Sequence, residues 1–282
     1  PQAPKQIPKA KALSLLDKVL SDPGIKKIGQ NIKYDYIVLK RESLQLQGLA
    51  LDSMILSYLL EPNWGKHNLD KLAVVYLQVK AIPYHEVVGK GKNEVKINAV
   101  DIDKVAPYAC QDADLALQLS SLLWPMVKDK NLDRVYQELE LPLVEVLADM
   151  EMWGVKVDNK ALEDLSSELE RELKCLEKKI YEASGVEFNI NSPQQLAHVL
   201  FEKLNLPASR KTRITKSYST DVSILQELSA VHPVAKHALE YRQLVKLKSS
   251  YADSLPLLIN PETGRIHTSY NPVSYTHLTL PT

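Results

Sequence analysis

The sequence has few of the residues that stabilise small secreted proteins or mark membrane spans. Its two cysteines, Cys110 and Cys175, lie far apart in 282 residues and match no metal or redox spacing. This excludes a disulfide scaffold, and we expect both thiols to be reduced in a cytoplasmic protein. No apolar run reaches the roughly 18 residues of a membrane helix, and no signal-peptide pattern opens the chain.

The chain also has no excess charge of either sign. Lysine plus arginine and aspartate plus glutamate number 35 each, so the net charge neither favours nor opposes a nucleic-acid partner. Hydrophobic residues make up 45% and charged residues 25%, which is typical of a globular protein. The length allows two ordinary domains.

Both ends of the chain are unusual for a native protein. Pro1-Gln2-Ala3-Pro4 begins without methionine, and Val273–Thr282 is rich in Thr, Leu and Pro with no helical or strand period. We expect the chain to be a fragment, with residues 272–282 a tail unrelated to the domains before it.

Residues 1–131 alternate short apolar runs with helical patterns. Ile25–Ile28 and Leu49–Leu51 are expected strands, while a helix from Gln30-Asn31 and one at Ser53–Leu60 follow them. A long helical pattern spans about Ile102 to Val127. Strands alternating with helices predict an α/β domain.

The pattern becomes helical in residues 132–271. Val135–Trp153 and Lys160–Ala183 are expected helices, and Ser192-Pro193 has the cap and first-turn residues that open another. Pro233 to about Leu258 is helical, whereas Gly264–Tyr270 alternates like a strand. Between these helices, residues 209–220 form a loop with four basic residues: Arg210, Lys211, Arg213 and Lys216.

Two pairs of side chains have the spacing of a metal-dependent hydrolase. Asn31 and Asp35 stand four residues apart, as do Tyr108 and Asp112, so each pair would share one helix face. Phosphodiester hydrolysis on two metal ions needs carboxylates to hold the cations and a group to orient the water. On spacing alone, however, solvated aspartates and a packed tyrosine remain the more common interpretation.

An ordered series of motifs adds weight to the chemical interpretation. Ile28-Gly29-Gln30-Asn31 through Asp35 resembles the second exonuclease motif of bacterial DNA polymerase I proofreading domains, and Tyr108–Asp114 resembles the third. The later segments resemble the polymerase thumb and the strand where it meets the palm: Gly154–Asp158, Phe188–Ser192, Tyr218–Thr220, Leu239–Arg242 and Gly264–Thr268. The resemblance runs from about residue 9 to 271.

The resemblance implies a ribonuclease-H-like 3′→5′ exonuclease domain, lacking its N-terminal part, followed by a mostly α-helical thumb. It implies that Asp35 and Asp112 hold Mg²⁺ (or Mn²⁺ or Zn²⁺) and that Tyr108 orients the attacking water. The remaining substrate contacts that it implies are Gln30, Asn31, Lys66 and Tyr84. Tyr84 would stack a terminal base, although a half-buried core tyrosine is equally plausible, and Lys66 is also an ordinary surface lysine.

One motif of the family is absent. The only Asp-x-Glu is Asp149-Met150-Glu151, which falls on an expected helix after the third motif, so we interpret it as a solvated helix face. Without the first motif the metal site lacks about half of its carboxylates. We therefore expect the chain alone to be inactive as a nuclease, although its parent would proofread and polymerise DNA.

The thumb is expected to bind primer–template duplex through phosphates, which is a sequence-independent interaction. The implied contacts are Asn189, Asn191 and Ser192 at a helix N-terminus, the basic loop of Arg210, Lys211, Arg213 and Lys216, and Arg242 with Lys246 on one helix face. We expect a monomer. Two alternatives remain: a stand-alone exoribonuclease of the same superfamily, and a DNA-binding thumb joined to a decayed, non-catalytic nuclease domain.

Overall fold

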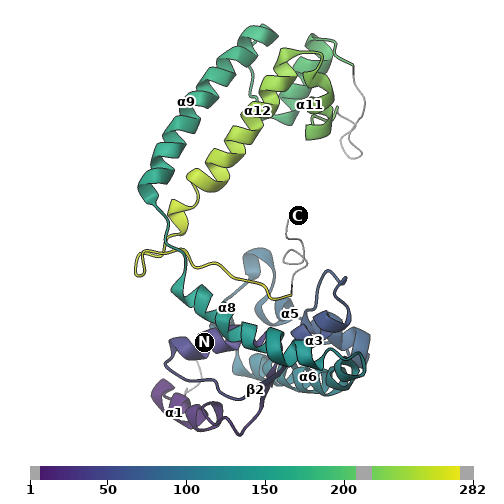
Figure 1. Cartoon of the computed structure of the whole chain (residues 1–282), viewed down its shortest axis with the longest axis vertical. Helices are drawn as coiled ribbons and strands as arrows, with labels where there is room; N and C mark the ends of the chain where they lie inside the picture. The colour runs from purple at the N-terminus through teal and green to yellow at the C-terminus, as the bar shows by residue number, and fades with distance from the viewer. Residues whose placement is uncertain (1–6, 208–217, 274–282) are drawn as a thin grey trace. The chain divides into compact units, whose positions relative to one another are not determined.

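The computed structural model describes residues 7–207 and 218–273, and these form two compact units (Figure 1). Unit 1 takes the described residues up to Trp153 together with those from Thr268, and unit 2 takes those from Gly154 to His267. The chain therefore passes between the units twice. Compact units and family domains need not share limits, and the domain limits at 131/132 and 271/272 stay predictions.

Unit 1 surrounds a small sheet with helices. In chain order its elements are α1 (Lys9–Leu20), β1 (Lys27–Gly29), α2 (Ile32–Arg41), β2 (Leu49–Asp52), α3 (Ser53–Leu60), α4 (Leu69–Leu72), the π-helix η1 (Ala73–Leu77), α5 (Tyr84–Val88), the 3₁₀ turns η2 (Gly91–Asn93) and η3 (Ile97–Ala99), α6 (Ile102–Asp129), α7 (Asp133–Val135), the π-helix η4 (Tyr136–Glu140) and α8 (Leu141–Trp153). The expected α/β pattern of the first part is confirmed.

The sheet of the described residues consists of β1 and β2, which pair in parallel. Ile28 faces Leu51 and Gly29 faces Asp52 in the register, after an irregularity at Lys27. Both strands therefore end at the same edge, and α2 and α3 begin there. Parallel strands place the polar groups that follow them at one edge of the sheet, which is the usual position for a ligand site in open α/β folds.

The core of unit 1 lies between the sheet, α3 and the C-terminal half of α6. Ile55 and Leu56 of α3 and Leu119 and Leu123 of α6 are fully buried. Tyr136 is also fully buried, and its hydroxyl donates to Ala50 O at 3.2 Å and accepts from Asp52 N–H at 2.8 Å. A buried phenol needs such partners, and these hydrogen bonds fix η4 against β2.

Unit 2 is helical. Its elements are α9 (Asn159–Ser184), α10 (Pro193–Ala197), the π-helix η5 (His198–Lys203), α11 (Val222–Ser229), α12 (Pro233–Leu247), the π-helix η6 (Lys248–Ala252) and the 3₁₀ turn η7 (Pro256–Leu258). The helices α9 and α12 run side by side (Figure 1). At one end of the pair Ile180, Leu200, Leu225 and Val234 form a buried core.

Gly154 begins unit 2 in a conformation that other residues adopt at a cost. Its φ is +65°, and a Cβ there would lie 2.9 Å from Ile266 O and from the His267 ring. Gly264 has the same φ of +65° with nothing within 4 Å of that position. Substitution of Gly264 would therefore introduce backbone strain alone, whereas substitution of Gly154 would introduce the same strain and a steric clash.

Two sequence-based expectations need correction. Gly264–Tyr270 does not form a strand in the described residues, where it makes two isolated bridges, Val155 with Ile266 and Asn260 with Arg265. Residue alternation alone does not supply the neighbouring strand that a sheet requires. Asn31 is the residue before α2, with φ 56° and ψ 48°, and is not on the helix itself.

Within the residues that the structure describes, no helix is long and apolar enough to span a bilayer.

Candidate active site

The carboxylate of Asp52 positions the start of α2. Asp52 is 1% exposed and accepts N–H bonds from Asn31 at 3.1 Å, Ile32 at 2.8 Å and Met54 at 2.8 Å, with a longer one from Ile55 at 3.4 Å. One side chain therefore caps both α2 and α3, whose first N–H groups have no partner within their own helices. This capping fixes the position of the segment that carries Asp35.

A pocket of about 650 Å³ opens next to this capped helix end. Asp35 from α2 and Asp112 from α6 both line it, together with Gln30 and Asn31 from the turn before α2 and Asn68 from the turn before α4. The segments come from three regions of the sequence. The expectation that the two aspartates meet at one site agrees with this arrangement.

Protein atoms crowd the Asp35 carboxylate although its side chain remains exposed at the pocket wall. Desolvation raises the pKa of Asp35 above its ordinary value, and a hydrogen bond from its own backbone N–H partly offsets the rise. A positive charge placed beside such a carboxyl group stabilises its ionised form. A cation in the pocket would supply that charge.

Tyr108 and Asp112 interact along one face of α6. Desolvation and then a hydrogen bond with the Asp112 carboxylate raise the pKa of Tyr108 to about 12. Desolvation raises the pKa of Asp112, and the hydrogen bond from Tyr108 lowers it. The expected pairing of phenol and carboxylate four residues apart is present in the structure.

Two further side chains complete this end of the site. The ring of Tyr84, which is 47% exposed, lies 6.2 Å from the Tyr108 ring, centroid to centroid. The charge of Asp70 raises the pKa of both Tyr108 and Asp112. Tyr84 is thus neither deep in the core nor isolated, and an aromatic ring at an accessible position can stack a base.

Gln30 is held by internal hydrogen bonds. Its amide donates to His67 O at 2.8 Å, and its side-chain oxygen accepts from the Ser53 hydroxyl at 2.5 Å. Lys66, which was an expected phosphate contact, is exposed and does not line the pocket, and its carbonyl accepts from Lys71 at 3.2 Å. Gln30 therefore contributes to the shape of the pocket wall, and Lys66 remains a predicted contact.

The donor set fits one side of a divalent-cation site. Asp35 and Asp112 offer the carboxylate oxygens that hard cations prefer, and Asn68 adds an amide to the same wall. Among the described residues no group of three or more His, Cys, Asp or Glu side chains is arranged to hold a metal ion. The pocket thus offers part of a coordination shell.

The expected phosphate contacts of unit 2 take part in turn structure. The side-chain oxygen of Asn189 accepts from Asn191 N–H at 3.0 Å, and the Ser192 hydroxyl accepts from Gln195 N–H at 3.4 Å. The Asn191 amide approaches the Tyr241 hydroxyl at 3.4 Å. Ser192 therefore caps α10, as its sequence pattern indicates, and a DNA contact here stays a prediction.

Arg242 is more engaged than the sequence indicates. Its guanidinium donates to the carbonyl oxygen of Thr220 at 2.5 Å and to the Thr220 hydroxyl at 3.1 Å, and burial lowers its pKa. Lys246, one turn along α12, is exposed. Lys246 is therefore freer to meet a phosphate than Arg242. The four residues of the basic loop, which are Arg210, Lys211, Arg213 and Lys216, lie outside the described residues.

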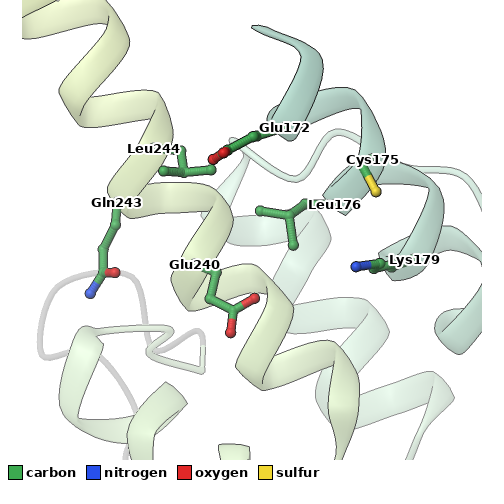
Figure 2. Close-up of a pocket in the computed structure, with 7 residues that line it drawn as sticks. All are labelled: Glu172, Cys175, Leu176, Lys179, Glu240, Gln243 and Leu244. Carbon is green, nitrogen blue, oxygen red and sulfur yellow. The ribbon is translucent and has the colours of Figure 1, made fainter. Parts of the chain in front are cut away.

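A second pocket, of about 360 Å³, lies between α9 and α12 (Figure 2). Leu176 and Leu244 form its apolar part, and Glu172, Lys179 and Glu240 surround them with charges of both signs. Of the family-like segments it contains only Glu240, from Leu239–Arg242, and it contains none of the expected site residues. We assign it no role in the chemistry.

Sequence reasoning missed the structural environment of three acidic residues. Asp52 ends an apolar run and could have been identified as a cap, because it comes directly before the helix of Ser53–Leu60. Asp70 lies on an expected helix, and the sequence indicated no role for it in the site. Glu151 belongs to the Asp-x-Glu that was interpreted as solvated, and its side chain is 13% exposed and paired with Lys33, so that interpretation is wrong for Glu151.

Comparisons with known proteins define the class of each part. Residues 3–128 match the family model described as 3′-5′ exonuclease, and residues 159–277 match the one described as DNA polymerase family A. A polymerase that carries an exonuclease domain is the class that these two matches define. The first part of the chain is thus similar to 3′-5′ exonucleases and the second to family A DNA polymerases, and the expected α/β exonuclease part followed by a helical thumb-like region is confirmed.

Similar proteins carry the name DNA polymerase I. The chain is 42% identical over 275 residues to that of Rhizobium leguminosarum, covering 97% of this chain and 27% of the relative. It is 40% identical over 272 residues to that of Pseudomonas aeruginosa, covering 95% and 30%. A solved structure titled as the POL domain of Pol1 from M. smegmatis with DNA primer-template and dNTP matches with a TM-score of 0.73 and 28% identity. That match covers 95% of this chain and 42% of the other. The chain thus spans less than a third of the curated relatives' length.

Proposed function

We propose that the chain is part of a proofreading DNA polymerase, in which unit 1 carries half of a metal-dependent 3′→5′ exonuclease site. The observation that carries the proposal is the convergence of Asp35 and Asp112 on one pocket beside Tyr108. These are the residue types that two-metal hydrolysis of a phosphodiester uses. The match of each part to its family model supports the same activity.

In this proposal each residue has a separate role. Asp35 and Asp112 would hold a divalent cation, with Mg²⁺ as the expected ion, and such a cation would supply an activated water for hydrolysis. Tyr108 orients the attacking water through its hydroxyl, which is hydrogen-bonded to Asp112. Tyr84 stacks the terminal base of a single-stranded 3′ end, and Asn31 contacts the same strand.

Unit 2 is proposed to bind the primer–template duplex through phosphates. Lys246 on α12 is exposed, and Ser192 and the neighbouring asparagines lie at the N-terminus of α10. The basic loop adds positive charge without a balancing acid for twelve residues. Backbone contacts of this type bind duplexes of any sequence, which is what a polymerase requires.

Metal binding by the chain tests the exonuclease part without requiring turnover. Mn²⁺ broadens NMR resonances of nearby nuclei, so titration should selectively broaden Gly29, Asn31 and Ala113 at the pocket wall. Asp35→Asn and Asp112→Asn should each abolish the broadening, and Asp17→Asn on α1 serves as the control. Broadening that is absent, or that persists in both pocket variants, contradicts the assignment.

The expected inactivity of the 282-residue chain is tested separately. The purified chain with Mg²⁺ should release no nucleotides from single-stranded DNA, because its sequence holds no strand-borne Asp-x-Glu to complete the cation site. Digestion that disappears in Asp112→Ala would show that two carboxylates suffice.

A further inference from the structure

The carboxylate of Glu151 on α8 joins three segments of unit 1. It forms an ion pair with Lys33 of α2, whose ammonium also donates to the carbonyl oxygen of Tyr270. Glu151 accepts from the backbone N–H of Tyr270 at 2.7 Å and from the Ser269 hydroxyl at 3.3 Å. One acidic side chain therefore connects α2, α8 and the segment 268–273, which returns from unit 2.

This node is shielded from solvent. The side chains of Lys33 and Glu151 are 6% and 13% exposed. A charge at such a site is costly unless it is paired and its remaining hydrogen bonds are satisfied, and both conditions hold here. The second acid of the motif, Asp149, pairs with Lys40 of α2 at the surface, where the two side chains are 48% and 40% exposed. Exposed pairs of that kind contribute little.

The helix α2 contacts α8 through one face, and Asp35 lies on a different face of the same helix. Lys33 and Lys40 are seven residues apart, so they lie on one face of the helix, and both pair with α8. Asp35 is two residues from Lys33, about 200° around the helix, on the face that lines the pocket. A shift of α2 on α8 would therefore move Asp35 relative to Asp112 of α6.

We propose that Glu151 is a positioning residue for the exonuclease site, and that it couples the placement of α2 to the segment 268–273. The segment lies within residues 159–277, which match the polymerase family model, whereas α2 lies within the exonuclease match. Glu151 thus links the two family parts through direct contacts of one side chain. The catalytic part of this inference rests on the proposed function, but the coupling does not.

Hydrogen–deuterium exchange of the 282-residue chain tests the coupling. Glu151→Gln keeps the side-chain shape and removes the charge, so residues 32–41 and 268–273 should both exchange at least about tenfold faster, because a broken buried pair allows local opening. Peptides from the core of α6 around Leu119 should be unchanged. The matched control is Asp149→Asn on the same helix, which removes the exposed pair and should leave both segments near their original rates.

A charge reversal separates the ion pair from the contacts to Tyr270. In the double variant Lys33→Glu/Glu151→Lys the pair is restored, but a lysine then faces the Tyr270 N–H and a carboxylate faces the Tyr270 carbonyl. Neither arrangement can form a hydrogen bond. Exchange of residues 32–41 should therefore recover while that of 268–273 stays fast.

Three outcomes would overturn the proposal. The first is unchanged exchange of α2 in Glu151→Gln. The second is equal acceleration of exchange in the α6 core of that variant, which would mean a general loss of stability. The third is acceleration in Asp149→Asn equal to that in Glu151→Gln. Mn²⁺ broadening at the pocket provides an independent readout. Its absence from the unsubstituted chain counts against the proposed nuclease function, whereas faster exchange of both segments together with lost Mn²⁺ binding in Glu151→Gln supports the positioning role.

Discussion

Asp52 provides the sharpest test of how unit 1 is held together. It is buried, and desolvation raises its pKa to about 6 even though four backbone N–H groups donate to it and lower the pKa. Asp52→Asn removes the titration and keeps the shape and one acceptor oxygen. The pH dependence of the difference between the two proteins therefore isolates the carboxylate.

The sign of the effect follows from the direction of the shift. The folded chain binds the Asp52 proton more tightly than the unfolded chain, whose reference pKa is 3.8. The stabilising contribution of the proton is therefore complete below that reference value and is lost as the pH rises through about 6. Acidification from about pH 7.5 to about pH 4.5 should raise the stability of the unsubstituted chain relative to Asp52→Asn by about 2 kcal/mol.

Tryptophan fluorescence can follow this effect in unit 1 alone. The three tryptophans of the chain, Trp64, Trp124 and Trp153, all precede Gly154, and two of them pack against the unit 1 core. Denaturant unfolding followed by fluorescence then reports the free energy of unfolding of this unit at each pH. Taking the difference between the two proteins at each pH cancels the other titrating groups.

Two results would refute the reasoning. A difference that does not change with pH would mean that the carboxylate is not desolvated in the folded chain. A difference that falls on acidification would mean that its N–H donors dominate and depress the pKa. Either result would show that burial does not raise the pKa of Asp52 in the folded chain.

Three further predictions concern the site, the start of unit 2 and the thumb. Tyr108→Phe should raise the pKa of Asp112, because the hydrogen bond from Tyr108 lowers that pKa, and Asp70→Asn should lower the pKa of Asp112 because it removes a neighbouring negative charge. NMR titration of the Asp112 carboxyl carbon measures both changes. Shifts in the same direction would contradict the placement of Tyr108 and Asp70 around Asp112. Gly154→Ala should destabilise unit 2 by about 1–3 kcal/mol more than Gly264→Ala, measured by exchange of its helices, since only the first adds a clash to the strain. Charge reversal of Arg210, Lys211 and Arg213 in the basic loop should weaken duplex binding, measured by fluorescence anisotropy, and should flatten its salt dependence by about one unit of slope per lost phosphate contact. Lys156→Glu serves as the control. Unchanged affinity would exclude a DNA contact by the loop.

The carboxylates were predictable because their spacing and motifs are local. Tyr108 and Asp112 lie one turn apart on a long helix, so their side chains meet whatever the rest of the chain does. Asp35 was identified from its motif, but its meeting with Asp112 depends on a tertiary arrangement of α2 and α6 that no local pattern encodes. The pocket is therefore a tertiary result.

The Asp-x-Glu shows the limit of pattern reasoning. Helical spacing places Asp149 and Glu151 on a helix, and acidic residues on helices are usually solvated. The burial of Glu151 is decided by Lys33, 118 residues earlier in the chain, and by Tyr270, 119 residues later. Only the fold can place residues so distant around one carboxylate.

The sequence alone determined the family likeness of each part, the extent of the helices α6 and α9 and the choice of candidate metal ligands, because motifs and helical periodicity are properties of neighbouring residues. The tertiary structure decided which side chains share the pocket, the capping of α2 and α3 by Asp52, and the pairing of Lys33 with Glu151. Desolvation and long-range pairing arise only when distant segments exclude water together, so the raised pKa values of the site also belong to the fold.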